Sequence, residues 1–159
     1  MTGGARALLG MLLAASAVAA AAAPAVPFAT DLRSYATESA RSAAPLVLFF
    51  TLPDCAYCHT VRHSYLAPLV RGEGGRRYVV REIVIDSQRK VAGLDGKAAT
   101  HRALAQRFGV RFGPTVLFVD GVGKALAPPL VGGDTAGMYG AYLDARLAEA
   151  SGRLANAVK

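Results

Sequence analysis

The chain has 159 residues, with 18 lysines and arginines against 11 acidic residues and a formal net charge of +7. This length suits one domain with a real hydrophobic core rather than two. The basic residues are scattered, and the tightest group is Arg71, Arg76, Arg77 and Arg81. Because the sequence has no basic helix and no alternation of basic and aromatic residues, it argues against nucleic-acid binding and favours a basic surface suited to acidic partners.

The N-terminal segment has the pattern of a secretory signal peptide. Arg6 precedes an uninterrupted run of small and apolar residues over 7–23, ALLGMLLAASAVAAAAA. We expect a signal peptide over residues 1–25, cleaved between about residues 20 and 26, and a mature domain over residues 26–159. The run is short and rich in alanine for a membrane-spanning helix. A retained membrane anchor is the alternative.

The rest of the chain alternates between predicted helices and strands. The predicted helices cover residues 31–43, 55–70, 97–108 and 134–150, and the predicted strands cover residues 46–51, 78–86, 114–120 and 125–131. The run LVLFFT at 46–51 is continuously apolar, which is typical of a strand buried on both faces. Residues 88–96 are predicted to form a loop. The order helix, strand, helix, strand, helix, hairpin, helix predicts a mixed sheet covered by helices on both faces.

Single residues set some of the expected boundaries. Pro68 should kink or end the second helix, because proline removes a hydrogen-bond donor and clashes with the preceding turn. Gly109 should end the third helix. Asp134 should cap the last helix.

Both cysteines lie in one motif, Cys55-Ala56-Tyr57-Cys58-His59. Two cysteines separated by two residues at a helix start are close enough to bond, and the exposed amides there favour a thiolate on the first. Cys55, at the end of the helix, is therefore the predicted attacking sulfur. Cys58, one turn further in, is the predicted resolving sulfur.

The same motif admits three other interpretations. CxxCH is also the signature of c-type haem attachment, although a buried strand precedes it here and Met138 is the only methionine beyond the leader. The two cysteines could bind zinc with His59, His63 or His101, but there is no second ligand pair. A purely structural disulfide would close too short a loop to stabilise the chain much. We expect no metal, and no cofactor other than the redox-active disulfide.

The chain resembles the thioredoxin superfamily, specifically its small exported bacterial members. The resemblance spans residues 45–149 and rests on the apolar strand at 46–51, the CxxC helix, and the sequence VRFGPT at 110–115. It implies an α/β thioredoxin fold with a mixed four-stranded central sheet flanked by helices on both faces. It also implies a cis-proline at Pro114 opposite the cysteines, with Gly113, Pro114 and Thr115 contacting the substrate chain.

The sequence departs from typical thioredoxins at two places. Ala56 and Tyr57 stand between the cysteines where Gly-Pro is usual, and Phe49 stands where the family has a buried acid that accepts a proton. Proton transfer must then use water or another group, and His59 is the nearest candidate by sequence. Tyr57 and His59 are similar to the residues of Dsb-type periplasmic proteins and of thioredoxins associated with sulfur oxidation.

Size narrows the function that the resemblance implies. The chain has no room for the helical insertion of a Dsb-type oxidase or the dimerisation domain of a Dsb-type isomerase. We therefore expect a monomeric periplasmic reductase or electron relay that exchanges disulfides with protein partners and is recharged by a membrane thiol donor. The alternatives are a c-type haem electron-transfer protein and a thioredoxin-like binding or chaperone module.

Overall fold

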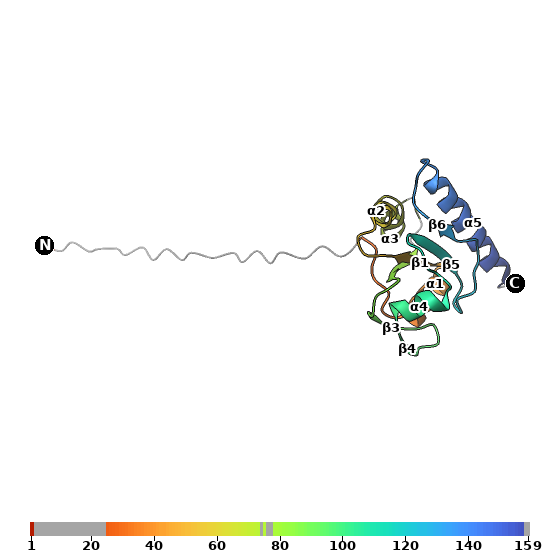
Figure 1. Cartoon of the computed structure of the whole chain (residues 1–159), viewed down its shortest axis with the longest axis horizontal. Coiled ribbons are helices and arrows are strands. Elements are labelled where there is room, and N and C mark those ends of the chain that lie inside the picture. Colours follow the sequence, from red (N-terminus) through yellow and green to blue (C-terminus); the bar gives the residue numbers. More distant parts are fainter. Residues whose placement is uncertain (2–24, 74, 76–77, 158–159) are drawn as a thin grey trace.

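A four-stranded mixed sheet forms the centre of the computed structural model, which describes Met1 and residues 25–73, 75 and 78–157 (Figure 1). Its strands are β1 (Leu46–Thr51), β2 (Val79–Val84), β5 (Thr115–Val119) and β6 (Leu130–Val131), in the order β2-β1-β5-β6. The β1–β2 pair is parallel, and the β1–β5 and β5–β6 pairs are antiparallel. The predicted signal peptide falls almost entirely on residues outside the described set, as do Arg76 and Arg77.

The central strand β1 divides the core into two halves. Every residue of β1 is buried, as its unbroken apolar sequence predicts. Because side chains alternate along a strand, Val47 and Phe49 join one hydrophobic cluster while Leu48 and Phe50 join the other. The sheet therefore has two different buried faces, and each needs its own cover of helices.

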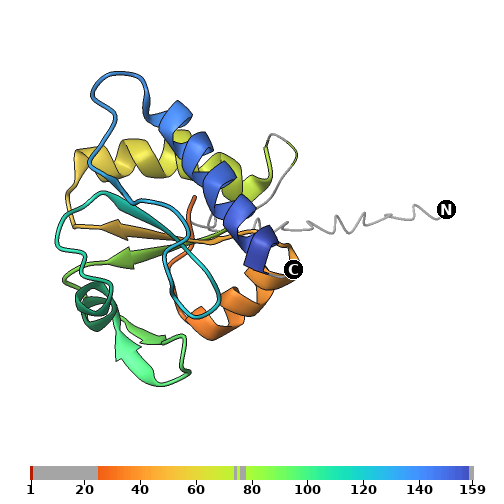
Figure 2. The same ribbon diagram turned by 90° about the vertical axis from the view of Figure 1, so that its right-hand side faces the viewer.

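Helices cover both faces of the sheet, as predicted (Figure 2). One face packs against the consecutive helical segments α2 (Ala56–Thr60), η1 (Val61–Leu66) and α3 (Ala67–Arg71), and against α5 (Tyr139–Ala157). The other face packs against α1 (Leu32–Arg41) and α4 (His101–Arg107). We call these the cysteine face and the opposite face. No helix among the described residues is long and apolar enough to cross a membrane.

The consecutive segments α2, η1 and α3 form one continuous helix, which we call the cysteine helix. Pro68 changes the type of this helix instead of ending it. Pro68 lies in the first turn of α3, directly after the π-helical segment η1. Proline lacks an N–H group and crowds the carbonyl four residues earlier. In the π-helical turn before it, backbone hydrogen bonds instead join residues five apart, such as that from the Ala67 N–H to the Arg62 carbonyl. The helix then runs on to Gly72, whose φ of 78° closes it in the left-handed conformation.

A short hairpin replaces part of one predicted loop and one predicted helix. Strands β3 (Lys90–Ala92) and β4 (Ala98–Thr100) pair in antiparallel fashion. Helix α4 consequently starts at His101, where the Thr100 side chain caps it by accepting the Ala103 N–H. The predicted helix start at residue 97 is therefore wrong by four residues.

The C-terminal part also differs from its prediction, in the bounds of β6 and of the last helix. Strand β6 is only two residues long, because Pro128 and Pro129 have no N–H to donate to a ladder. Asp134 does not begin the last helix. Its carboxylate accepts the Met138 N–H at 3.1 Å in the turn before α5, which starts at Tyr139 and extends to Ala157.

Candidate active site

The two cysteines form a disulfide at the start of α2. Their Cα atoms are 5.2 Å apart. Cys55 is the N-cap residue, and its Sγ accepts the Cys58 N–H at 3.1 Å. Cys55 is half-buried and Cys58 is only 1% exposed, so a partner can reach the first sulfur and not the second. The structure thus gives the two cysteines the unequal access that attack and resolution require.

The Gly113–Pro114 loop lies against the turn that leads into the cysteines. The peptide bond between these two residues is cis. A Cβ atom on Gly113 would lie 3.1–3.2 Å from backbone atoms of Thr51 and Leu52, so glycine lets the two segments approach without crowding. The Thr115 hydroxyl donates to the Phe112 carbonyl at 2.7 Å and closes the loop. The predicted substrate-binding residues are therefore placed beside the N-terminal end of the cysteine helix.

Tyr57 and His59 lie on the surface around the disulfide. The Tyr57 side chain is 56% exposed and covers the loop after β6, where a Cβ on Gly133 would lie 2.5 Å from its ring. That loop is held by Asp134, which accepts a hydrogen bond from the Tyr65 hydroxyl on the cysteine helix. His59 is exposed. Both residues are placed to contact a molecule that approaches Cys55.

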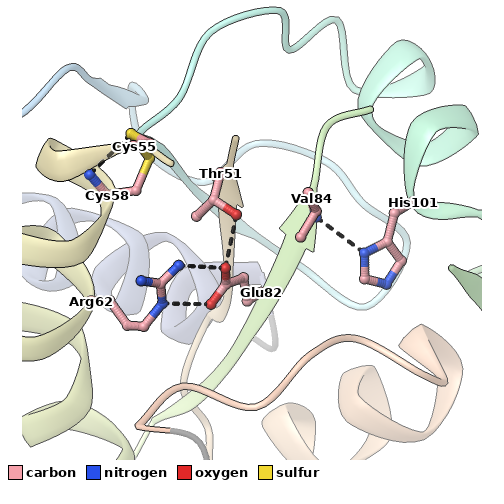
Figure 3. A network of polar contacts seen from close by, with 7 residues as sticks. All are labelled: Thr51, Cys55, Cys58, Arg62, Glu82, Val84 and His101. Carbon is pink, nitrogen blue, oxygen red and sulfur yellow. Dashed lines mark hydrogen bonds and ion pairs between the residues drawn. A yellow bond between two sulfur atoms is a disulfide. The ribbon is translucent and has the colours of Figure 1, made fainter. Parts of the chain in front are cut away.

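A buried carboxylate lies near the disulfide, and the sequence analysis missed it (Figure 3). Glu82 of β2 is 2% exposed and sits in register opposite Phe49. The Thr51 hydroxyl donates to its Oε1 at 2.8 Å, and the Arg62 guanidinium donates to both carboxylate oxygens at 2.6 and 2.8 Å. The hydrogen bond to Glu82 raises the pKa of Arg62 above its usual value. Glu82 and Arg62 therefore form a bidentate ion pair.

The buried carboxylate lies next to the position where the family has its acid. Phe49, at that position, is fully buried and has no group that accepts a proton. Glu82 stands directly opposite Phe49 on the neighbouring strand. The sequence contains a signal for it, since Arg81 and Glu82 interrupt an otherwise apolar stretch and Glu82 shares a face with Val80. Only the strand pairing shows that this face is the cysteine face.

A pocket of about 510 Å³ connects the carboxylate to the disulfide. Cys55, His59, Arg62 and Glu82 all line it. Its mouth is open, so water can enter the space between the attacking sulfur and the buried ion pair. The arrangement places the accessible Cys55 and a buried carboxylate at one open pocket, while Cys58 is enclosed.

His101 is not part of this site. It is fully buried on the opposite face, where its Nδ1 accepts the Val84 N–H at 3.1 Å and its Nε2 donates to the Ala29 carbonyl at 2.8 Å. Burial lowers its pKa, so the ring is held neutral. Within the described part of the chain, no three His, Cys, Asp or Glu side chains gather in a way that could hold a metal ion.

The mixed sheet and the CxxC disulfide at a helix start define a thiol–disulfide oxidoreductase of the thioredoxin fold. Residues 33–146 match the family described as "Thioredoxin-like domain", and the chain belongs to this family. No curated protein matches the chain.

Several solved structures have a similar fold. One described as DsbH oxidoreductase is 20% identical, covers 88% of this chain and 95% of its own, and superimposes with a TM-score of 0.53. Thioredoxin O2 from Arabidopsis thaliana in its oxidised state is 15% identical over 76% of this chain and 94% of its own, with a TM-score of 0.48. A thioredoxin-fold protein from Helicobacter pylori is 17% identical over 71% of this chain and 86% of its own, with a TM-score of 0.45.

Proposed function

We propose that this protein is an exported, monomeric protein-disulfide reductase or electron relay that works in the periplasm. The observation that carries the proposal is the unequal access of its two sulfurs, with half-buried Cys55 at the helix start and Cys58 almost fully enclosed. The leader-like sequence at residues 1–25 supports export.

The proposed reaction is a two-step disulfide exchange. The Cys55 thiolate attacks one sulfur of a partner disulfide, so that a Cys55–partner bond forms and one partner thiolate leaves. The Cys58 thiolate then attacks Cys55 Sγ, which restores the intramolecular disulfide and releases the second partner thiolate. Two electrons pass to the partner, and the two protons lost by the cysteine thiols end on the partner thiols. A membrane thiol donor reverses the exchange and recharges the pair.

The second step needs an acceptor for the Cys58 proton, and Glu82 is the group that we assign to this role. Arg62 and Thr51 hydrogen-bond its carboxylate and hold it in place on the cysteine face. The pocket provides a route for water between Glu82 and Cys55. In this role Glu82 takes up the proton by way of pocket water and returns it to the solvent. His59 lines the same pocket and offers a second exit.

The partner is a protein segment that carries a disulfide. Phe112, next to Gly113, and Tyr57, between the two cysteines, are 70% and 56% exposed and offer apolar contact to such a segment. The backbone at Gly113 pairs with the partner chain. The basic surface favours partners with acidic flanks.

The equilibrium potential of the cysteine pair against glutathione tests the direction of electron flow. A value below about −220 mV supports a reductant, and a value near about −120 mV contradicts it.

Cys58→Ser should accumulate a mixed disulfide with a model partner peptide, because the attacking sulfur remains and the resolving sulfur is gone. Cys55→Ser is the matched control and should trap nothing. A haem Soret band on the purified protein would support the haem alternative, and full function of Cys55→Ser/Cys58→Ser would support the binding or chaperone alternative.

Export has its own test. Expression of the full chain in a bacterial host should yield a processed protein in the periplasmic fraction, with a new N-terminus between about residues 20 and 26. An unprocessed chain in the cytoplasmic fraction contradicts export, and an unprocessed chain in the membrane fraction supports the retained anchor.

A further inference from the structure

Two histidines stand one above the other on the exposed side of the cysteine helix. The ring centroids of His59 and His63 are 4.3 Å apart, with the ring planes at 36°. Both residues are exposed. His59 lies near the end of α2, and His63 lies in the π-helical segment η1. Residues four positions apart are neighbours on one face of a helix, and here the two rings meet.

We propose that His59 and His63 together chelate a divalent first-row transition ion, Cu²⁺ or Zn²⁺, beside the predicted attacking sulfur. Imidazole nitrogen suits both ions. Two histidines four residues apart on one helix face are the ligand pair of known helical zinc motifs. His59 also lines the pocket that contains Cys55, so the ion would stand at the mouth of the pocket.

The charges around the pair permit a bound cation. Arg62 lies between the two histidines in sequence, but both of its hydrogen-bonded nitrogens donate to the Glu82 carboxylate, which offsets its charge. Metal binds the neutral form of the imidazole ring.

The site has two protein ligands and open coordination positions. No group of three or more potential metal-binding side chains occurs among the described residues, so water completes the coordination. The third histidine of the chain, His101, is buried with both ring nitrogens hydrogen-bonded. Any imidazole binding by the folded protein must therefore come from this pair. By the general order of divalent ions, Cu²⁺ should bind more tightly than Zn²⁺.

The test is titration of the full oxidised protein with Cu²⁺, followed by calorimetry and electron paramagnetic resonance. Because Cys55 and Cys58 are joined in this form, their thiols cannot bind the ion. We expect one tight site per chain and a spectrum with splitting from two nitrogens. His59→Gln and His63→Gln should each lower the affinity at least about tenfold and resemble the double variant, because chelation needs both rings.

Ser64→Gln is the matched control, since it places the same amide at an exposed neighbouring position and spares the pair. It should bind like the unmodified protein, and circular dichroism should show all variants folded. The proposal is overturned if the double variant binds Cu²⁺ as tightly as the unmodified protein, or if each single variant keeps its affinity within about twofold. Disulfide exchange is not measured here, so failure of metal binding leaves the redox proposal untouched, and failure of the redox proposal leaves this one untouched.

Discussion

The two faces of the central sheet each bury one ionisable side chain beside strand β2, and the two are treated in opposite ways. On the cysteine face, Glu82 is charged and paired with Arg62 beside an open pocket. On the opposite face, His101 is neutral and bonded only to backbone groups. Both are satisfied, as buried polar groups must be. What separates the site residue from the structural one is the access that the surroundings leave to it, and not its burial.

The two side chains also join different parts of the chain. His101 ties α4 to the end of β2 and to the segment at Ala29, which itself pairs with Glu82 through the backbone along the edge of the sheet. Glu82 ties β2 to Arg62 on the cysteine helix. We therefore expect changes on the opposite face to alter stability alone, and changes around Glu82 to alter stability and redox chemistry together. The following predictions test that division.

The largest expected loss of stability comes from a core change on the opposite face. Phe50 is fully buried and packs edge-on against Phe108, with ring centroids 5.9 Å apart. Phe50→Ala should lower the free energy of unfolding by about 3–5 kcal/mol, because it removes apolar contact and leaves a cavity. Urea denaturation measures this. Phe50→Leu is the milder control. In the folded fraction the potential of the cysteine pair should be unchanged, and a shifted potential would show that the two faces are coupled.

Removing Arg62 should separate what the ion pair contributes to stability from what it contributes to the redox chemistry of the cysteine face. Arg62→Met leaves Glu82 buried without a cation, which costs about 3 kcal/mol or more of unfolding free energy. Arg62→Met/Glu82→Gln should recover most of that loss, because no unpaired charge remains. We also expect the potential of the cysteine pair to shift in Arg62→Met, because the variant changes the charge that lines the pocket beside Cys55. Equal stability of the single and double variants would contradict the role given to the ion pair.

The sequence was sufficient for the features that local chemistry determines. The unbroken apolar run gave β1 its bounds at Leu46–Thr51, and the cysteine spacing predicted the disulfide. The predicted strand at 125–131 is longer than β6, because Pro128 and Pro129 have no N–H to donate to a neighbouring strand. Those two prolines are a signal in the sequence for the shorter strand. The β3–β4 hairpin has only three residues in each strand, too few for a periodic pattern to emerge.

Glu82 was missed for a different reason. Its position opposite Phe49 depends on the register of two strands that lie 33 residues apart in sequence. The π-helical segment η1 before Pro68 likewise did not follow from the sequence, because the proline alone predicted a kink or an end. Local patterns identify candidate residues, but tertiary pairing decides which of them meet.

A smaller effect is expected from His101. His101→Leu fills the space of the imidazole with an apolar side chain, but it leaves the Val84 N–H and the Ala29 carbonyl without their partner. Each unsatisfied buried group carries a penalty, so the free energy of unfolding should fall by about 2–3 kcal/mol. Urea denaturation near neutral pH checks this value, and hydrogen exchange should show the loss at the Val84 amide. Unchanged exchange at that amide would mean that the bond contributes nothing.

The smallest effect is the pH dependence that His101 gives to folding. Burial lowers its folded pKa below the value of 6.5 for a free histidine. Between those two values the unfolded chain binds more protons than the folded one, so stability rises with pH in this window. The contribution is complete above about pH 6.5 and is lost as the pH falls towards the folded pKa.

Urea midpoints measured at about pH 7.5 and about pH 5.5 should fall less with acidification in His101→Leu than in the unmodified protein. His63, whose pKa is also lowered, contributes with the same sign, so His63→Gln is measured alongside and its share subtracted. An equal drop in His101→Leu and the unmodified protein would show that His101 is not held neutral.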